Sequence, residues 1–393
     1  MRSSSFLQRN VAIMKYRTLG RTGLSVSEIG FGGEHIMNAD YKTSEAIMRT
    51  AMDAGVNIMD VFMPQPDVRS HMGDALKGHR QEVILQGHIG AALQNGQYVR
   101  SRDPKLSEEY IQDFLTRFHT DYIDLGMMHF IDTEEDYQKS FHSEYIDYCL
   151  GLKKRGIVRY LGVSSHNAVT AAKMVNSGLV DVVLFSINPA FDLLPAQTHI
   201  DDYWKNETYA PNRLTIDPER AAFYRLCEEK GVGITVMKTL GAGRLLDAER
   251  SSFGFALTPA QCIHYALERP AVASVLMGAK TVEEMQQSLA YETASDAEKD
   301  YSILGEGTKS SMNGKCMYCN HCLPCPVGLD VAAVNKYLDL AQQNNAPDTV
   351  RAHYDALEHH ATDCIRCGMC ETRCPFHVPV RENMDKAAEI FGK

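Results

Sequence analysis

Two short runs of cysteines near the C-terminal end constrain this chain more than any other feature of its sequence. Eight of the eleven cysteines lie beyond residue 315, and each run ends in a Cys-Pro pair. The two runs are Cys316-x-x-Cys319-x-x-Cys322-x-x-Cys325-Pro326 and Cys364-x-x-Cys367-x-x-Cys370-x-x-x-Cys374-Pro375. Spacing of two residues lets the thiolates of one loop converge on neighbouring irons of a cubane cluster. Disulfides and two zinc sites are the alternatives, but without an export signal we expect a reducing compartment, where clustered cysteines more often bind metal. We therefore predict two [4Fe–4S] clusters.

The spacing of the second run is that of bacterial ferredoxins, and the first run is one residue short of it. In two-cluster ferredoxins the fourth cysteine of each run binds the other cluster. By this resemblance one cluster is held by Cys316, Cys319, Cys322 and Cys374, and the other by Cys364, Cys367, Cys370 and Cys325. The insert between the runs, residues 329–361, is rich in helix formers and should pack this module against the rest of the chain. The remaining cysteines, Cys149, Cys227 and Cys262, are scattered singly and are predicted to be small buried hydrophobes.

The overall composition is that of a globular chain. A length of 393 residues allows one large domain and an appendage, and the 44% hydrophobic and 23% charged content is ordinary. A net charge of -10 argues against a nucleic-acid partner. No apolar run reaches the length of a membrane helix, and the first residues lack the apolar core of a secretory signal. We therefore expect a cytoplasmic protein with no membrane partner.

Upstream of the cysteines, apolar strand-like runs alternate with amphipathic helical stretches. Such helical stretches include residues 44–54, 107–118 and 259–267. No glycine-rich dinucleotide fingerprint follows any strand, which favours a barrel over a doubly wound sheet, with another α/β layer fold as the alternative. The predicted strands are residues 27–32, 56–61, 82–87, 122–129, 158–164, 180–187, 232–238 and 271–278.

The predicted fold class is therefore α/β, a (β/α)₈ TIM-type barrel followed by a small α-helical ferredoxin-like iron–sulfur domain. We place an N-terminal extension at residues 1–14, the barrel at 15–300 and the cluster domain at 301–393. Residues 188–217 follow the sixth strand with no clear period. A long irregular insertion there is expected to act as a lid or specificity loop, or as a docking surface for the cluster domain.

The ends of the first four predicted strands are unusually polar. Glu34 and His35 follow the first strand, Asp60 ends the second, His88 follows the third and His129 ends the fourth. Barrel active sites are built at the C-terminal ends of the strands. We therefore expect Asp60, His88 and His129 to line a functional mouth.

Several segments together make the chain resemble the aldo-keto reductases, specifically the bacterial branch with a ferredoxin-like tail. The resemblance implies an NADPH-dependent carbonyl reductase in which a Tyr is the general acid, assisted by Lys, Asp and His. The segments, besides both cysteine runs, are YRTLGRTGLSVSEIGFGG (16–33), AGVNIMD (54–60), YIDLGMMHFID (122–132), KKRGIVRYLGVSSH (153–166), LGAGRLL (240–246) and MGAKTVEEM (277–285).

The resemblance also exposes departures at the catalytic positions. Asp60 and His129 stand at the family's Asp and His positions, but Gln65 stands where the Tyr belongs and His88 where the Lys belongs. A Gln side chain cannot deliver a proton in the transition state. Our hypothesis is that His88 and His129 together supply the acid, since imidazolium is a competent donor near neutral pH.

The cofactor positions are partly kept. Ser164 is retained, whereas Ser165 replaces an Asn, Leu184 a Gln that holds the carboxamide, and Ile187 a stacking Tyr; the Asn near the adenine is Ser288. The resemblance implies NADPH binding by Ser164, Ser165, Asn188, Lys238, Gly241, Gly243, Gly278, Lys280 and Thr281.

Three functions fit these features. The first is a reductase of a small organic substrate that uses NADPH hydride; direct exchange with clusters would need a flavin or another two-to-one electron converter. The second is a single-electron reductase fed by a ferredoxin or flavodoxin, with a metal ion or a flavin at the mouth. The third is a non-catalytic electron carrier or sensor.

Overall fold

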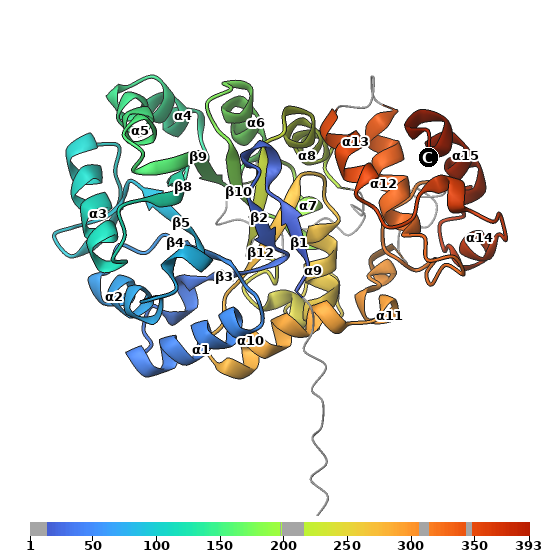
Figure 1. Ribbon diagram of the computed structural model, residues 1–393, viewed down its shortest axis with the longest axis horizontal. Helices are drawn as coiled ribbons and strands as arrows, with labels where there is room; N and C mark the ends of the chain where they lie inside the picture. Colours follow the sequence, from blue (N-terminus) through green and yellow to red (C-terminus); the bar gives the residue numbers. More distant parts are fainter. Residues whose placement is uncertain (1–13, 197, 199–215, 306–313, 343–347) are drawn as a thin grey trace, which may run out of the picture.

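The central feature of the fold is a closed barrel of eight parallel strands. The computed structural model describes residues 14–196, 198, 216–305, 314–342 and 348–393. Around the barrel the strand order is β10-β11-β12-β3-β4-β5-β8-β9 (Figure 1). Each strand falls on one of the eight predicted strands, so the predicted fold class is confirmed. The bounds are β3 Ile29–Gly32, β4 Ile58–Val61, β5 Ile84–Ile89, β8 Ile123–Met128, β9 Val158–Ser165, β10 Val182–Ser186, β11 Gly233–Met237 and β12 Val272–Met277.

Helices surround the barrel. The helical stretches predicted at 44–54, 107–118 and 259–267 are confirmed as α1, α3 and α9. Side-chain caps fix where the helices begin, because the first backbone N–H groups of a helix have no partner within it. In α9 the Thr258 side chain accepts from Gln261 N while Gln261 reaches back to Thr258 N, and Pro259 fills the first turn. The bounds are α1 Tyr41–Asp53, α2 Pro66–Ala75, α3 Pro104–Arg117, α4 Glu134–Phe141, α5 Glu144–Lys154, α6 Ala168–Asn176, α8 Pro218–Lys230, α9 Pro259–Leu267 and α10 Val282–Leu289.

The lower half of the barrel interior is apolar and is closed at the N-terminal ends of the strands. A hairpin of β1 Tyr16–Thr18 and β2 Ser25–Ser27 covers this end. Leu19 and Val26 of this segment are fully buried and pack in one cluster with interior residues such as Leu125. The barrel is therefore closed at the N-terminal ends of its strands, and any ligand must enter at their C-terminal ends.

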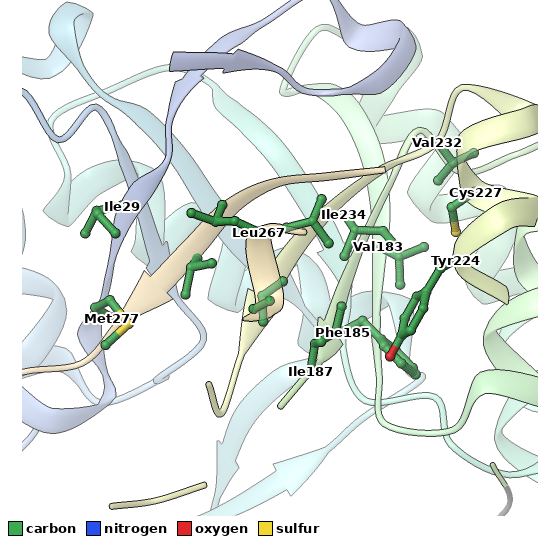
Figure 2. Close-up of a cluster of buried hydrophobic side chains, with 14 of the residues drawn as sticks. Ile29, Val183, Phe185, Ile187, Tyr224, Cys227, Val232, Ile234, Leu267 and Met277 are labelled. Atoms are coloured by element: carbon green, nitrogen blue, oxygen red, sulfur yellow. The ribbon is translucent and has the colours of Figure 1, made fainter. Parts of the chain in front are cut away.

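Between the barrel and its helices lies a second apolar layer. Figure 2 shows Val183 and Phe185 of β10 facing Tyr224 and Cys227 of α8. The Phe185 and Phe223 rings pack with centroids 4.6 Å apart. The lone cysteines Cys149, Cys227 and Cys262 are all fully buried, as predicted.

The cysteine-bearing part packs beside α8 and α9, on the side of the barrel away from α2 and α3 (Figure 1). Its helices are α12 Val331–Ala341, α13 Asp348–Asp355, α14 Met369–Arg373 and α15 Val380–Phe391, so the helical insert predicted at 329–361 is confirmed. Lys336 of α12 lies 3.3 Å from Glu268 of the barrel, and both side chains are buried. Thr349 donates to Glu228 O at 2.8 Å. The domain boundary at residue 300 stays a prediction. Among the described residues no helix is long and apolar enough to cross a membrane.

The predicted irregular segment 188–217 begins with a short helix, α7 Pro189–Asp192, and most of the remainder lies outside the described residues. Asp192 is completely buried. Its carboxylate accepts from Arg220 Nε at 2.9 Å, from Tyr265 OH at 2.8 Å and from Tyr224 OH. This network fixes the start of the segment to α8 and α9.

We expect Asp192→Ala to lower the free energy of unfolding by about 3–5 kcal/mol, because it removes a fully buried carboxylate that pairs with the Arg220 guanidinium and accepts from two tyrosine hydroxyls. Chemical denaturation of the purified chain measures this. The control is Glu135→Ala, whose exposed ion pair with Lys139 contributes little. Equal effects of the two substitutions would contradict the assignment.

Candidate functional site

The alternation of side chains along parallel strands brings three predicted residues together. Residues two apart on a strand face the same side, so the apolar interior residue Ile58 is followed by Asp60 on β4. The same period places His88 near the end of β5, and His129 follows β8 directly. Asp60, His88 and His129 are exposed by only 7%, 3% and 6%. They form a polar layer above the apolar interior.

Hydrogen bonds join these side chains in one series. His88 Nε2 lies 3.0 Å from Asp60 Oδ1, and His88 Nδ1 lies 2.6 Å from His129 Nδ1. The Gln86 amide donates to the same Asp60 oxygen at 2.6 Å and accepts from Thr235 at 3.0 Å. Gln86 and His88 therefore hold the Asp60 carboxylate through one shared oxygen.

The series ends at Tyr98, a residue that sequence reasoning missed. Tyr98 lies on a hairpin of β6 Ala91–Gln94 and β7 Gln97–Arg100, and its hydroxyl hydrogen-bonds to His129 Nε2. The available signal was the dipeptide Asn95-Gly96, whose φ values of 52° and 74° are those of a tight hairpin turn. The hairpin directly follows β5 and returns Tyr98 over the mouth.

Both imidazoles are held tightly and shielded from water. The Phe62 ring stacks on His129 with centroids 5.7 Å apart and an interplanar angle of 5°. Arg102 donates to His129 O at 2.8 Å. Burial, followed by the charges of His88 and Arg102, holds the pKa of His129 well below 6.5. His129 is therefore neutral at pH 7.

The other polar residues predicted at the mouth do not join this series. Glu34 and His35 lie exposed on a short 3-10 helix, Gly33–Ile36, and the His35 ring covers Gly278 so closely that a Cβ there would lie 2.1 Å from Nδ1. Gln65 precedes α2, and its Oε1 is buried with no hydrogen-bond partner among the residues that the structure describes. At the barrel mouth, no three His, Cys, Asp or Glu side chains among the described residues are arranged to hold a metal ion.

The two serines predicted to hold the nicotinamide are occupied by protein groups. Ser164 Oγ accepts from Phe130 N at 2.8 Å, and Ser165 Oγ donates to Asp132 at 3.0 Å. Asp132 also bonds His166 Nδ1 at 2.9 Å. These contacts fix the loop after β8. Ser165 already donates its hydroxyl proton to Asp132, whereas Ser164 accepts from Phe130 N and, among the described residues, keeps its own proton to donate.

Three neighbouring strand ends carry buried polar atoms with no partner within the described chain. They are His166 Nε2 after β9, Ser186 Oγ at the end of β10 and Thr239 Oγ1 after β11. Buried polar atoms are ordinarily hydrogen-bonded. A polar ligand bound across these three strand ends could satisfy these atoms.

The remaining predicted cofactor residues fall in two loops. In the first loop, Asn188 Nδ2 donates to Lys238 O at 2.8 Å and lies beside Gly241. Gly241 and Gly243 both have positive φ values, 56° and 81°.

In the second loop, which follows Gly278, Thr281 caps α10 with its side chain. There Lys280 N donates to Glu284 Oε2 at 2.7 Å while the Lys280 side chain is exposed. The Glu284 carboxylate at this position disfavours a phosphate on the Lys280 backbone, so within this loop the exposed Lys280 side chain is the group suited to attract one.

The two cysteine runs interleave. Cys322 and Cys325 of the first run line one pocket together with Cys364, Cys367 and Cys370 of the second. Cys374 of the second run lies close enough to Cys319 and Cys322 for its charge to raise the pKa of both thiols. The fourth cysteine of each run thus lies by the other run.

The cysteine loops share a backbone conformation suited to binding anionic sulfur. Tyr318 and Arg366, each two residues after the first cysteine of a run, have φ 59° and 58°. Their N–H groups donate to Cys316 Sγ and Cys364 Sγ. Burial raises the pKa of Cys319 to about 12, so its thiolate requires a metal or cluster to stabilise it.

A parallel barrel with acid–base groups at its strand ends, joined to paired four-cysteine loops, defines a TIM-barrel oxidoreductase with an iron–sulfur domain. The comparisons agree: the aldo/keto reductase family matches residues 28–256, and a 4Fe-4S dicluster domain matches residues 315–379. The chain belongs to the aldo/keto reductase family.

Similar proteins span most of the barrel. An uncharacterized oxidoreductase of Bacillus subtilis, YqkF, is 26% identical over 285 residues, which cover 70% of this chain and 90% of YqkF. L-galactose dehydrogenase of Arabidopsis thaliana is 27% identical over 46% of this chain and 61% of its own length. The holo form of aldo-keto reductase AKR11C1 from Bacillus halodurans shares the fold with a TM-score of 0.57 and 23% identity, covering 73% of this chain and 94% of that one.

We expect the His129 ring to stay neutral as the pH is lowered from 7 through 6.5. Its pKa is lowered by burial and by the nearby His88, Arg102, Arg100 and His166. Since an unfolded His titrates near 6.5, the unfolded chain takes up this proton first, and the neutrality of His129 lowers stability as the pH falls below about 6.5.

Imidazole NMR of the labelled holoprotein, with the His129 signal assigned by its loss in His129→Gln, measures this directly. A His129 signal that titrates at or above pH 6.5 would contradict the buried placement.

Proposed function

We propose that this protein is a reductase that transfers hydride from NADPH to a carbonyl group of a small organic substrate at the barrel mouth. The observation that carries the proposal is the series Asp60, His88 and His129, held by hydrogen bonds at three neighbouring strand ends. An ionised carboxylate that orients two imidazoles is an arrangement for moving a proton, and hydride reduction of a carbonyl requires one proton for each hydride.

The cofactor would lie across the ends of β9, β10 and β11. His166 Nε2, Ser186 Oγ and Thr239 Oγ1 are available to its nicotinamide end, while Lys280 supplies positive charge at its phosphate end. NADPH, when bound, supplies the hydride. The protein's part is to orient the substrate against it and to deliver the proton.

For the cysteines we propose two [4Fe–4S] clusters with crossed ligands, in residues 301–393. The first is held by Cys316, Cys319, Cys322 and Cys374, and the second by Cys364, Cys367, Cys370 and Cys325. The pocket that both runs line supports a sharing of ligands between the runs, and the nearness of Cys374 to Cys319 and Cys322 supports its place in the first set.

The position of the cluster domain favours hydride over cluster electrons at the mouth. The domain packs on α8 and α9, whereas Asp60, His88 and His129 belong to the part of the barrel nearer α2 and α3 (Figure 1). A single-electron reductase fed by a ferredoxin or flavodoxin remains the second candidate, supported by the full set of eight cysteines.

An anaerobic titration of the cluster-replete protein with NADPH tests the proposal. We expect nicotinamide fluorescence to report binding and the cluster absorption to stay unchanged. The control is Lys280→Ala, which should weaken binding of NADPH more than of NADH, because Lys280 offers the charge that a 2′-phosphate meets. No binding at millimolar NADPH would overturn the hydride proposal and favour reduced ferredoxin or flavodoxin as the donor.

Paired substitutions test the crossed ligands. With crossed ligands, Cys316→Ala with Cys374→Ala removes two ligands of one cluster and should cost half of the bound iron. Cys316→Ala with Cys325→Ala removes a ligand from each cluster and should cost nearly all of it. Iron analysis and EPR of the reduced protein measure this, with Cys262→Ala as the control. Uncrossed ligands would reverse the two results.

A further inference from the structure

The two histidines of the mouth have no ring nitrogen left for a substrate. His88 uses Nε2 on Asp60 and Nδ1 on His129, and His129 uses Nδ1 on His88 and Nε2 on Tyr98. Both rings are more than nine-tenths buried. A proton that leaves this series toward the mouth must therefore pass through the Tyr98 hydroxyl.

Tyr98 is the member of the series that can reach a substrate. It is 39% exposed, against 6% for His129, and it lies on the hairpin that covers the mouth. Its phenol oxygen is bonded by His129 and by the Arg100 side chain. With two groups bonding the oxygen from the protein side, the hydroxyl proton is free to point outward.

The protonation of His88 decides which way the series donates. When His88 is protonated, its Nε2–H donates to Asp60 and its Nδ1–H donates to His129 Nδ1, so His129 carries its own proton on Nε2. His129 then donates to the Tyr98 oxygen and Tyr98 donates outward. When His88 is neutral, its Nε2–H still donates to Asp60, but the other two bonds reverse: His129 donates to His88 Nδ1, and Tyr98 donates inward to His129. His129 itself is neutral in both arrangements, in agreement with its lowered pKa.

We propose that Tyr98 is the catalytic proton donor of this reductase and that His129, His88 and Asp60 resupply its proton. This inference rests on the proposed hydride reduction. Hydride adds to the carbonyl carbon, the C=O π pair moves to oxygen, and that oxygen takes the Tyr98 proton.

The phenolate of Tyr98 then takes the Nε2 proton of His129, which takes the Nδ1 proton of His88. The products are the alcohol, the oxidised nicotinamide and a neutral His88, and one proton from water restores the starting state. A phenolate at position 98 is stabilised by Arg100 and Arg102, whose charges oppose the rise in the pKa of Tyr98 caused by burial.

With Tyr98 as the proton donor, the reaction needs no donor at position 65, where this chain has a glutamine. Gln65, at the start of α2, cannot donate a proton, and the hairpin after β5 brings a phenol to the mouth from another element. The donor has changed its place in the sequence while the Asp60 carboxylate keeps its place at the end of β4.

The test compares Tyr98→Phe with Tyr110→Phe in the cluster-replete protein. Tyr98→Phe keeps the ring and removes the hydroxyl. Tyr110 of α3 donates to Leu93 O in the same hairpin, so Tyr110→Phe costs the hairpin one hydrogen bond without touching the series. Iron content and NADPH binding of both variants show that they fold.

With a panel of aldehydes and ketones, we expect Tyr98→Phe to lower kcat by at least about 100-fold, the range for loss of a general acid, and to leave NADPH binding unchanged. Tyr110→Phe should keep the wild-type kcat. Labelled-histidine NMR gives a readout independent of turnover: the ring-nitrogen shifts of His129 should change in Tyr98→Phe and not in Tyr110→Phe.

The outcomes separate this inference from the proposed function. A wild-type protein that binds NADPH and turns over, with a Tyr98→Phe variant of equal kcat, overturns the role of Tyr98 alone. A wild-type protein with no NADPH-dependent turnover overturns both. Unchanged His129 shifts in Tyr98→Phe would remove the hydrogen bond on which the proposal stands.

Discussion

The desolvated hydrogen bond between Asp60 and His88 is the interaction on which the mouth depends. A buried carboxylate is tolerated only when other groups satisfy it, and here Gln86 and His88 share one of its oxygens. Once His88 is oriented by Asp60, its second nitrogen fixes His129, and His129 in turn fixes Tyr98. One carboxylate at the end of β4 thereby orients the side chains of the whole series up to Tyr98.

The barrel and the cluster domain are bound together by similar buried charges. Lys336 meets Glu268, whose pKa is lowered to about 2 because Lys336, His264, Arg17 and Arg269 outweigh the effect of its burial. The two parts therefore form one continuous packed structure, in which the cysteine loops lie beside α8 and α9. We interpret the clusters as coupled to the barrel through this side rather than through the mouth.

Much of the fold could be predicted from the sequence, because a parallel barrel repeats one signal eight times. Each buried strand reads as a short apolar run, and Asp60, His88 and His129 stand where such runs end. The crossing of the cysteine runs was implied by the resemblance to two-cluster ferredoxins, and its ligand assignment stays a prediction.

Other parts of the site could be found only from the three-dimensional structure. Tyr98 lies between two strands of the barrel and belongs to neither, so reading strand ends alone could not find it; only the Asn95-Gly96 turn pointed to the hairpin. The engagement of Ser164 with Phe130 and of Ser165 with Asp132 comes from contacts between neighbouring strands and loops, which the sequence pattern does not contain. The buried polar atoms of His166, Ser186 and Thr239, which have no hydrogen-bond partner among the described residues, could likewise be identified only from the contacts in the structure.

The most direct test of hydride transfer at this mouth is the fate of deuterium from reduced nicotinamide labelled at C4. Incubation of the cluster-replete protein with each of the two C4-deuterated forms of NADPH and a reducible carbonyl, followed by mass spectrometry of the alcohol, reports where the carbon-bound hydrogen originates. We predict that one of the two forms delivers its deuterium to the carbinol carbon. An alcohol that gains its carbon-bound hydrogen from water with both forms would contradict hydride transfer and point to electrons delivered by the clusters.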